Sequence, residues 1–341
     1  MEKQLTIAVP SYNAAATIRR CLDSMLGLDP RLEVLVINDG STDNTAEIVE
    51  GYRQRYPEQL QLLSKPNGGH GSGINMAIDH ASGRYFKVVD ADDWIVSENL
   101  IGLLDTLEKS EADAVITGYE TVNEATGKRI TYAADCRYAG QEIDVEQLLE
   151  VYDDIPSCCS FHGLFYRTGM YRGAGIRMSE GIFYEDHEYA TVPFAAVERI
   201  LILPILFYEY LLGSASQSVA FPNQVKRIGH IEQVVRDILQ FRQERGPLSP
   251  ARDDYFLRKL AVVVVSYFAV ALIKNPDKKQ GQQQADGFRR YLEEAEPELL
   301  RRISKKYKML VLFRRLHLPA ELYQGILDTK LYQRFRKLWI N

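Results

Sequence analysis

Short apolar runs alternate with segments of helical periodicity through the first 120 residues. The apolar runs predict buried strands at 5–9, 32–37, 60–63, 85–89 and 114–119. Apolar residues at helical spacing predict helices between them, at 14–26, 43–55, 74–80 and 97–109. Strands that alternate with helices of this length are typical of βαβ units. The pattern therefore predicts an α/β fold with a mainly parallel sheet flanked by helices.

The pattern changes after residue 120. Gly127 lies where a hairpin could turn, and further elements are expected at 145–152 (helix), 157–166 (strand), 189–197 (helix) and 200–210 (strand). From residue 221 onward the chain is predicted to be helical, at 224–245, 251–274, 283–294 and 297–313. The apolar run 260–273 is too short to span a bilayer and favours a buried helix. We therefore predict a catalytic domain at 1–220 and a helical domain at 221–341.

Unusual polar residues follow four of the predicted strands. They are Tyr12 and Asn13, then Asp39, then the glycine-rich loop at 67–73, and then Asp90 with Asp92. In open α/β sheets, ligands bind at the carboxyl ends of the strands. The sequence therefore predicts that these four segments converge on one cleft.

The fourth strand ends in three carboxylates within four residues, Asp90, Asp92 and Asp93. Neighbouring carboxylates repel one another, and each requires water or a cation. A divalent metal with a phosphate-bearing ligand would resolve the conflict, because hard cations take carboxylate and phosphate oxygens. The alternative is a solvated turn in which Asp92 or Asp93 caps the next helix.

The glycine-rich loop lacks the Lys-Ser/Thr ending of a P-loop and the spacing of a dinucleotide fingerprint. Its glycines still permit close approach to a ligand, and a following helix N-terminus favours a phosphate. His70 is either a proton donor or a surface residue. Asn75 is either a residue of the helix start or a ligand contact.

A second acidic cluster lies at Glu185 and Asp186, followed by His187. One interpretation is a helix N-terminus, where acidic residues favour the helix dipole. The other is a general base that takes a proton from an acceptor hydroxyl group. His187 is a further candidate, because the ordinary pKa of histidine suits that role.

Charge is unevenly distributed along the 341 residues. The net charge of −5 excludes a generally basic nucleic-acid binder, yet residues 301–341 hold eleven Lys or Arg and two acidic residues. Such a segment suggests an anionic partner surface. We expect 297–318 to form an amphipathic helix that covers its domain. For 330–341 we favour docking on an anionic membrane or a partner.

The four cysteines show neither metal-ligand spacing nor a disulfide framework, and we expect no signal peptide before the first strand. These features predict a reduced, cytoplasmic location, with the protein peripheral at the inner face of the plasma membrane if its basic tail docks there. Dimerisation through the helical region stays open.

Together the motifs resemble those of family 2 glycosyltransferases with the GT-A fold. The matching segments, in the same order and spacing, are 9–13 (VPSYN), 36–45 (VINDGSTDNT), 67–69 (NGG) with Asn75, 83–85 (GRY), 90–94 (DADDW) and 185–186 (ED). The resemblance covers about residues 4–215. The segment from 208 to Gln217 and Ser218 also resembles Gram-positive surface-polysaccharide and glycoprotein transferases.

The resemblance implies a role for each matching residue. Pro10, Tyr12 and Asp39 would hold the nucleobase, with uracil favoured. Asp90 would contact the ribose or a metal-bound water, and Asp92 would ligate Mn²⁺ or Mg²⁺ on the diphosphate. Asp186 would be the base, with Glu185 as the alternative. The full predicted set for the donor nucleotide is Pro10, Tyr12, Asn13, Asp39, Gly69, His70, Asn75, Asp90, Ala91 and Asp92, with Asp90 and Asp92 as metal ligands.

One position departs from the family pattern. Many members have a basic residue in a Tyr-x-Tyr-Arg run, whereas Leu211 follows Tyr210 here. A positive group for the leaving diphosphate would then come from His70 or Lys65, or the metal alone would suffice.

The predicted activity is an inverting, metal-assisted single displacement. A hexose or N-acetylhexosamine would move from a UDP-sugar to an acceptor hydroxyl on a cell-surface glycan, lipid-linked oligosaccharide or glycoprotein. A nucleotidyltransferase is a second hypothesis, but residues 10–13 offer no basic residue for an attacking phosphate. A non-catalytic nucleotide-sugar-binding assembly subunit is a third, and the presence of both Asp92 and Asp186 weighs against it.

Overall fold

The computed structural model describes residues 2–213 and 221–327 of the chain. The chain divides into two compact units, Met1–Ser214 and Ala215–Asn341. The boundary predicted near residue 220 borders a segment outside the described residues. The resemblance at Gln217 and Ser218 and the proposed docking tail at 330–341 also lie outside them.

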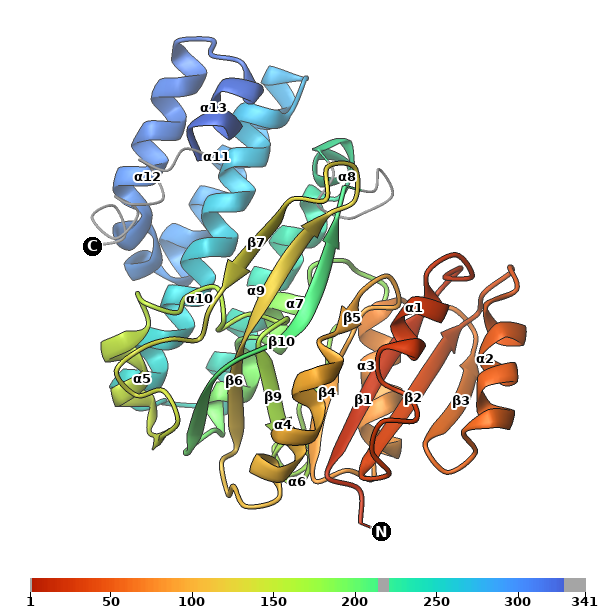
Figure 1. The fold of residues 1–341 in the computed structure, drawn as a ribbon. Helices are drawn as coiled ribbons and strands as arrows, with labels where there is room; N and C mark the ends of the chain where they lie inside the picture. The colour runs from red at the N-terminus through yellow and green to blue at the C-terminus, as the bar shows by residue number, and fades with distance from the viewer. Residues whose placement is uncertain (1, 214–220, 328–341) are drawn as a thin grey trace. The chain divides into compact units, whose positions relative to one another are not determined.

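The first unit is built on a ten-stranded mixed sheet (Figure 1). Its central path runs in the order β3-β2-β1-β4-β9-β6-β10-β5, with β7 paired to β6 and β8 paired to β10. The strands are β1 (Leu5–Ser11), β2 (Leu32–Asp39), β3 (Leu60–Lys65), β4 (Tyr85–Val88), β5 (Trp94–Ile95), β6 (Ala114–Asn123), β7 (Arg129–Tyr132), β8 (Glu142–Ile143), β9 (Leu164–Arg167) and β10 (Ile200–Leu212).

The mainly parallel character predicted from the sequence holds for the first four strands and for β6 with β10. The sheet becomes mixed because β9 pairs antiparallel with both β4 and β6. The hairpin predicted around Gly127 forms between β6 and β7, with Val122 opposite Arg129. The fold class predicted from the sequence is confirmed, with the sheet more mixed than expected.

Seven α-helices accompany this sheet. They are α1 (Ile18–Asp23), α2 (Thr45–Arg55), α3 (His70–His80), α4 (Leu100–Leu107), α5 (Val145–Val151), α6 (Thr168–Gly173) and α7 (Asp186–Tyr189). Short 3₁₀ turns occur at Ser97–Asn99 and Val192–Ala195.

Several predicted bounds were wrong, each for a local reason. The strand predicted at 157–166 is shorter and forms only β9, because the residues before it form turns. These turns bring the chain close to itself: a Cβ on Gly163 would lie 2.1 Å from the Cys158 carbonyl oxygen. The helix predicted at 189–197 splits into α7 and a 3₁₀ turn with Pro193 in its first turn. Helix α3 begins at His70, four residues earlier than predicted.

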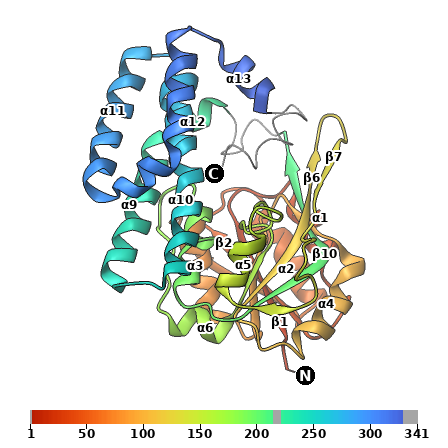
Figure 2. The ribbon, with the colours of Figure 1, turned by 90° about the vertical axis from the view of Figure 1, so that its left-hand side faces the viewer.

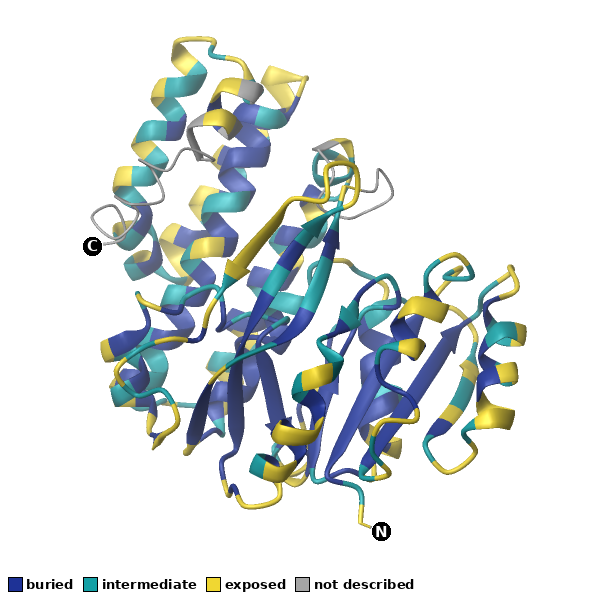
Figure 3. Cartoon of the chain, viewed as in Figure 1, coloured by how far each residue is buried: buried dark blue, intermediate teal, exposed yellow. Residues whose placement is uncertain are grey.

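The centre of the sheet is its most buried part. Every residue of β1 and β2 is buried, as is every residue of β4 (Figure 3). Strands buried on both faces are expected in a sheet covered by helices. This packing holds the carboxyl ends of β1, β2 and β4 rigidly at one edge, where the predicted site residues follow.

The second unit is helical (Figure 2). Its elements are α8 (Phe221–Lys226), α9 (Ile228–Arg245), α10 (Pro250–Ala269) with a π-helical extension (Val270–Lys274), α11 (Lys278–Ala295), α12 (Pro297–Arg315) and α13 (Ala320–Leu327). Helix α10 packs against α9 and α12. The segment Pro250–Lys274 is long and apolar enough to cross a membrane, but 72% of its most apolar window is buried within the structure. That burial fits the core helix expected from the sequence.

Candidate active site

The loops after β1 and β2 are joined by side-chain hydrogen bonds. Thr42 donates its backbone N–H to the Asn13 side-chain oxygen at 2.8 Å, and Asn13 donates its own N–H to Ser41 Oγ at 3.0 Å. Asn13 adopts a left-handed φ of 51°, a conformation that asparagine tolerates better than most residues. Tyr12 is 54% exposed beside this pair. The structure thus offers an aromatic ring to solvent at the strand ends, as the nucleobase prediction requires.

Asp39 organises the glycine-rich loop. It is 3% exposed, and its carboxylate accepts the backbone N–H groups of Gly68 and Gly69 at 2.9 and 2.8 Å. Lys65 adds a third bond to Asp39, at 2.8 Å. Its contact with uracil stays a prediction, and the structure shows that Asp39 also shapes the loop.

Lys65 was one candidate for the positive group near the leaving diphosphate. Its ammonium group donates to Asp39, to the Pro66 carbonyl and to Ser72 Oγ, each at 2.8 Å. An ammonium group has three donors, so these three bonds use all of them. We conclude that Lys65 stabilises the loop and presents no remaining donor to a diphosphate.

His70, the first residue of α3, connects two distant acidic segments. Its Nε2 lies 2.9 Å from Asp90 Oδ1, and its Nδ1 lies 2.6 Å from Glu185 Oε1. Burial by itself disfavours the charged ring, but the two carboxylates outweigh it and raise the pKa of His70 well above its ordinary value. The sequence placed His70 at the donor phosphates, whereas here both ring nitrogens contact carboxylates.

The three carboxylates after β4 converge, with one oxygen from each within 4.8 Å of the others. Asp93 is fully buried and accepts hydrogen bonds from the Tyr208 hydroxyl group and from the Leu211 backbone N–H. Burial and the charges of Asp90 and Asp92 raise the pKa of Asp93 well above its ordinary value. A hard cation would relieve this repulsion, and carboxylate oxygens are the donors it prefers.

The three aspartates are not equivalent ligands. Asp93 lies behind the turn with both oxygens engaged, as expected for a supporting residue, while Asp90 and Asp92 are partly exposed. Ala91 between them is 7% exposed. Arg20 donates to the Asp92 carbonyl oxygen at 2.8 Å and stacks 3.8 Å above the Trp94 ring. The donor set therefore fits a divalent cation on Asp90 and Asp92.

Residues 178–186 pack directly on the glycine-rich loop. Asn75 donates to the Met178 carbonyl oxygen at 2.9 Å and accepts from the Met178 N–H at 2.8 Å. Gly181 donates to the Gly68 carbonyl oxygen at 2.7 Å. A Cβ on Gly71 would lie 2.1 Å from the Ser179 carbonyl oxygen. Asn75 therefore holds this segment in place, and its predicted donor contact stays a prediction.

The two acidic residues of this segment have different surroundings. Glu185 precedes α7, is 4% exposed and is committed to His70. Asp186 opens α7 and is partly exposed. Tyr184 just before them has a left-handed φ of 74°, which is unusual for a bulky residue and is found in turns and at functional sites. Of the two carboxylates, Asp186 is the accessible one.

Two groups of the site were missed from the sequence. Lys87 on β4 is fully buried and donates to the carbonyl oxygens of Phe161, His162 and Leu164 at 2.6, 2.8 and 3.1 Å. Burial lowers its pKa well below the ordinary value. A lysine inside an apolar strand was the available signal, because such a charge needs specific partners.

His162 is the second missed group. Its ring stacks between Tyr210 and Tyr119, with centroid distances of 4.3 and 5.0 Å, and meets Tyr208 edge-on at 5.1 Å. Burial lowers the pKa of His162 to about 4, so the ring is neutral near pH 7. No motif marked this residue, because its role depends on aromatic residues from β6 and β10.

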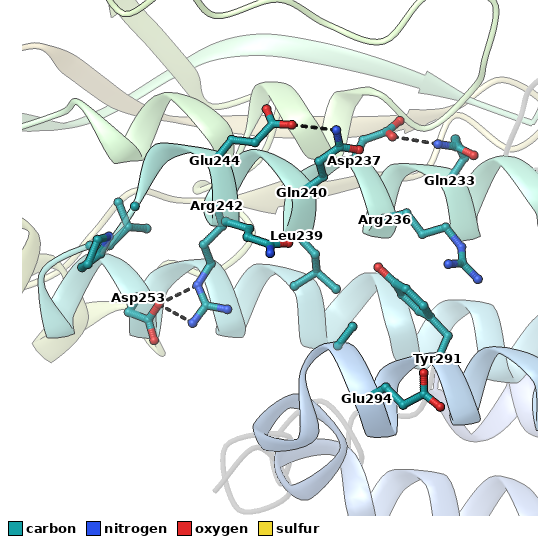
Figure 4. Close-up of a pocket in the computed structure, with 15 residues that line it drawn as sticks. Gln233, Arg236, Asp237, Leu239, Gln240, Arg242, Glu244, Asp253, Tyr291 and Glu294 are labelled. Atoms are coloured by element: carbon teal, nitrogen blue, oxygen red, sulfur yellow. Dashed lines mark hydrogen bonds and ion pairs between the residues drawn. The ribbon is translucent and has the colours of Figure 1, made fainter.

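A separate cavity of about 1120 Å³ lies in the helical unit (Figure 4). Several of its polar side chains are engaged with one another: Arg242 pairs with Asp253, and Gln240 donates to Glu244. The Tyr291 ring is covered by Arg236, whose guanidinium carbon lies 3.6 Å from the ring centroid. Among the residues that the structure describes, acidic side chains converge closely enough to hold a metal ion at Asp90, Asp92 and Asp93 and not in this cavity. We therefore place the candidate active site in the first unit.

Comparison with known proteins finds the family model described as glycosyl transferase family 2, which matches residues 6–167. Glycosyltransferase GlyA of Streptococcus pneumoniae is 25% identical over 224 residues, 64% of this chain and 32% of GlyA. The uncharacterized glycosyltransferase EpsJ of Bacillus subtilis is 29% identical over 212 residues, 60% of each protein. The matches to these relatives thus span between a third and three fifths of their length.

Two solved structures share the fold. Residues 1–349 of Staphylococcus aureus TarS in complex with UDP-GlcNAc superpose with a TM-score of 0.65 at 19% identity, covering 92% of both chains. The mannosyltransferase PcManGT from Pyrobaculum calidifontis, solved with GDP-Man and Mn²⁺, has a TM-score of 0.54 at 16% identity, covering 96% of this chain and 89% of that one. At these identities the likeness establishes the fold.

Proposed function

We propose that this chain, which carries a glycosyl transferase family 2 domain at residues 6–167, transfers a sugar from a nucleotide-sugar donor to an acceptor hydroxyl group. The observation that carries the proposal is the His70 bridge. It joins Asp90, 20 residues away, to Glu185, 115 residues away. The bridge thereby holds the carboxylate cluster that suits a cation beside the segment that carries Asp186, and a transfer reaction requires both groups.

The proposed donor is a UDP-linked hexose or N-acetylhexosamine. The exposed Tyr12 ring beside the β1 and β2 ends supports nucleobase stacking. The fold likeness to TarS, which was solved with UDP-GlcNAc, supports uracil as the base. Loop glycines Gly68 and Gly69, held by Asp39, would give the diphosphate close approach to backbone.

Asp90 and Asp92 are the residues that would hold Mn²⁺ or Mg²⁺. When bound, such an ion would neutralise negative charge on the diphosphate leaving group. The Mn²⁺ in the fold neighbour PcManGT supports this assignment. Asp93, held by Tyr208 and Leu211, keeps the turn in the conformation that presents its two neighbours.

Asp186 is the proposed general base. Glu185 is buried against His70, which leaves Asp186 as the accessible carboxylate of the pair. The Asp186 carboxylate takes the proton of the acceptor hydroxyl group as its oxygen forms a bond to the anomeric carbon. The bond from that carbon to the diphosphate oxygen breaks, and UDP leaves with the electron pair. A single displacement of this kind inverts the anomeric configuration.

The proposed acceptor is a hydroxyl group on a cell-surface glycan, a lipid-linked oligosaccharide or a glycoprotein. The matching relatives of Streptococcus and Bacillus are named only as glycosyltransferases, which leaves these three classes open. We propose that the reaction takes place in the cytoplasm and uses a soluble nucleotide-sugar donor.

A UDP-release assay tests the proposal. UDP-glucose, UDP-galactose and their N-acetylated forms would be screened with Mn²⁺, and the best donor used for variants. Asp186→Asn is expected to lose at least about a hundredfold in rate, because general base catalysis contributes on that order. Asp92→Asn is also expected to lose rate strongly, because the ion that would neutralise the leaving diphosphate would lose a ligand. Asp135→Asn, at an exposed position, is the matched control. Wild-type rates in both site variants would end this assignment.

A further inference from the structure

Helix α12 presents a basic and apolar stripe on the face opposite its buried contacts. Its buried residues are Leu299, Ile303 and Leu310, which pack toward the rest of the helical unit. Between 301 and 316 the exposed residues are all on one stripe: Arg301, Lys305, Lys308, Leu312, Arg315 and Leu316. From Arg301 to Arg315 the spacing is three or four residues, and Leu316 lies four residues after Leu312, so the set occupies one side of the helix. We call this set the α12 stripe.

The charge of this region differs from the rest of the chain. Residues 299–320 contain seven Lys or Arg and no Asp or Glu, whereas the whole chain has a net charge of −5. Among residues 2–213 and 221–327, neither Lys308 nor Arg315 forms an ion pair. The stripe is therefore a local positive surface, and ion pairs within the described fold do not neutralise Lys308 or Arg315.

The apolar part of the stripe is equally exposed. Leu312 and Leu316 are 53% and 59% exposed, and Leu322 on the neighbouring α13 is 45% exposed. Isolated exposed leucines are ordinary, but these two lie one turn apart and beside Lys308 and Arg315. Cations interleaved with leucines on one helical face are typical of helices that lie at a membrane interface.

We propose that the α12 stripe is a docking surface for an anionic lipid bilayer. Lys308 and Arg315 would bind headgroup phosphates, and Leu312 and Leu316 would insert at the boundary between the headgroups and the acyl chains. A nucleic acid would satisfy the cations but leave both leucines in water, so the combination favours lipid. The sequence predicted that 297–318 only covers its domain. The structure shows that its buried face does so, while its other face is exposed.

Vesicle flotation of the full-length protein tests this surface without any donor or acceptor, so the result is independent of the proposed reaction. Vesicles of equal parts phosphatidylglycerol and phosphatidylcholine are compared with vesicles of phosphatidylcholine alone. The wild-type protein is expected to float with the anionic vesicles only, and to dissociate as salt is raised.

Two variants separate the charged and apolar contributions. Lys308→Glu with Arg315→Glu, and separately Leu312→Ser with Leu316→Ser, are each expected to lower partition at least about tenfold. Lys279→Glu with Arg290→Glu, on the exposed face of α11, matches the first charge change and is expected to lower partition much less. Circular dichroism and thermal unfolding confirm that each variant is folded.

Three results would overturn the proposal. One is equal flotation with both kinds of vesicle. The second is that both α12 variants float as the wild type does. If Lys330→Glu with Arg334→Glu then abolishes flotation, docking belongs to the segment that follows α13. The third is retention of the protein on a polyanion resin without flotation, which would indicate a nucleic acid or another polyanion as the partner.

Discussion

The His70→Leu substitution tests the bridge that joins the aspartate turn to the base segment. It removes the bonds to Asp90 and Glu185 while keeping a side chain of similar volume. Hydrogen bonds to charged groups contribute roughly 1.5–3 kcal/mol each. The His70 and Asp90 side chains are 30% and 32% exposed, so their bond belongs at the low end because water screens it.

The bond to Glu185 should contribute more. The Glu185 side chain is only 5% exposed, and the substitution leaves a buried carboxylate without its partner. We expect a total loss of about 3–4 kcal/mol in the free energy of unfolding of the first unit. For a unit of this size the midpoint of thermal unfolding should fall on the order of 10 °C. Urea and thermal unfolding followed by circular dichroism measure the change.

His80→Leu is the matched control, because His80 lies exposed at the other end of α3 and its Nδ1 contacts only the Met76 carbonyl oxygen of the same helix. It should change stability by less than about 0.5 kcal/mol. A double-mutant cycle of His70→Leu with Glu185→Gln should give a coupling of about 1.5–3 kcal/mol. Additive effects of the two substitutions would refute the bridge.

Three further predictions concern other parts of the first unit. Burial lowers the pKa of His162 to about 4, so unfolding takes up a proton between pH 6.5 and pH 4. The stability advantage of the wild type over His162→Phe should be full above pH 6.5 and should fall by about 3 kcal/mol by pH 4. Urea titrations at each pH would measure this change. Burial raises the pKa of the Cys158 thiol to about 12. A thiol reagent at pH 8 should therefore label the less buried Cys136 first and Cys158 only when the protein unfolds. Rapid labelling of Cys158 in the native protein would contradict its burial. Gly71→Ala should displace the segment that carries Asp186 and lower both the stability and the rate of UDP release. Gly102→Ala in α4 has open space around its Cβ and should stabilise the protein by up to about 1 kcal/mol. Equal effects of the two substitutions on thermal unfolding would contradict the packing argument.

The order of elements in the first unit could be predicted because strand and helix periodicities differ strongly there. The convergence of strand ends followed from the parallel topology alone, and the structure places the ends of β1, β2 and β4 at one edge. The element bounds were less predictable. Helix α3 begins at His70 because Gly69, with a φ of 86°, allows the chain to turn directly into the helix.

The hydrogen-bond and packing partners of individual side chains could not be predicted from the sequence. Asp39, Asn75 and Lys65 all matched positions expected near a ligand, yet each is engaged by backbone or side chains of the fold. A motif indicates which residues gather at a site, whereas contacts 100 residues apart depend on tertiary packing. His162 and Lys87 escaped notice for the same reason, since their partners lie on β6, on β10 and in the turns before β9.

The most direct test of the proposed reaction measures UDP binding and UDP release side by side in two variants. Isothermal titration gives the affinity for UDP with Mn²⁺, and the coupled assay gives turnover. Asp186→Asn should bind UDP as wild type does and lose turnover at least about a hundredfold, because only the proton transfer is removed. Asp92→Asn should lose metal-dependent UDP affinity as well. Wild-type turnover by Asp186→Asn, or metal-dependent UDP affinity unchanged in Asp92→Asn, would contradict the account.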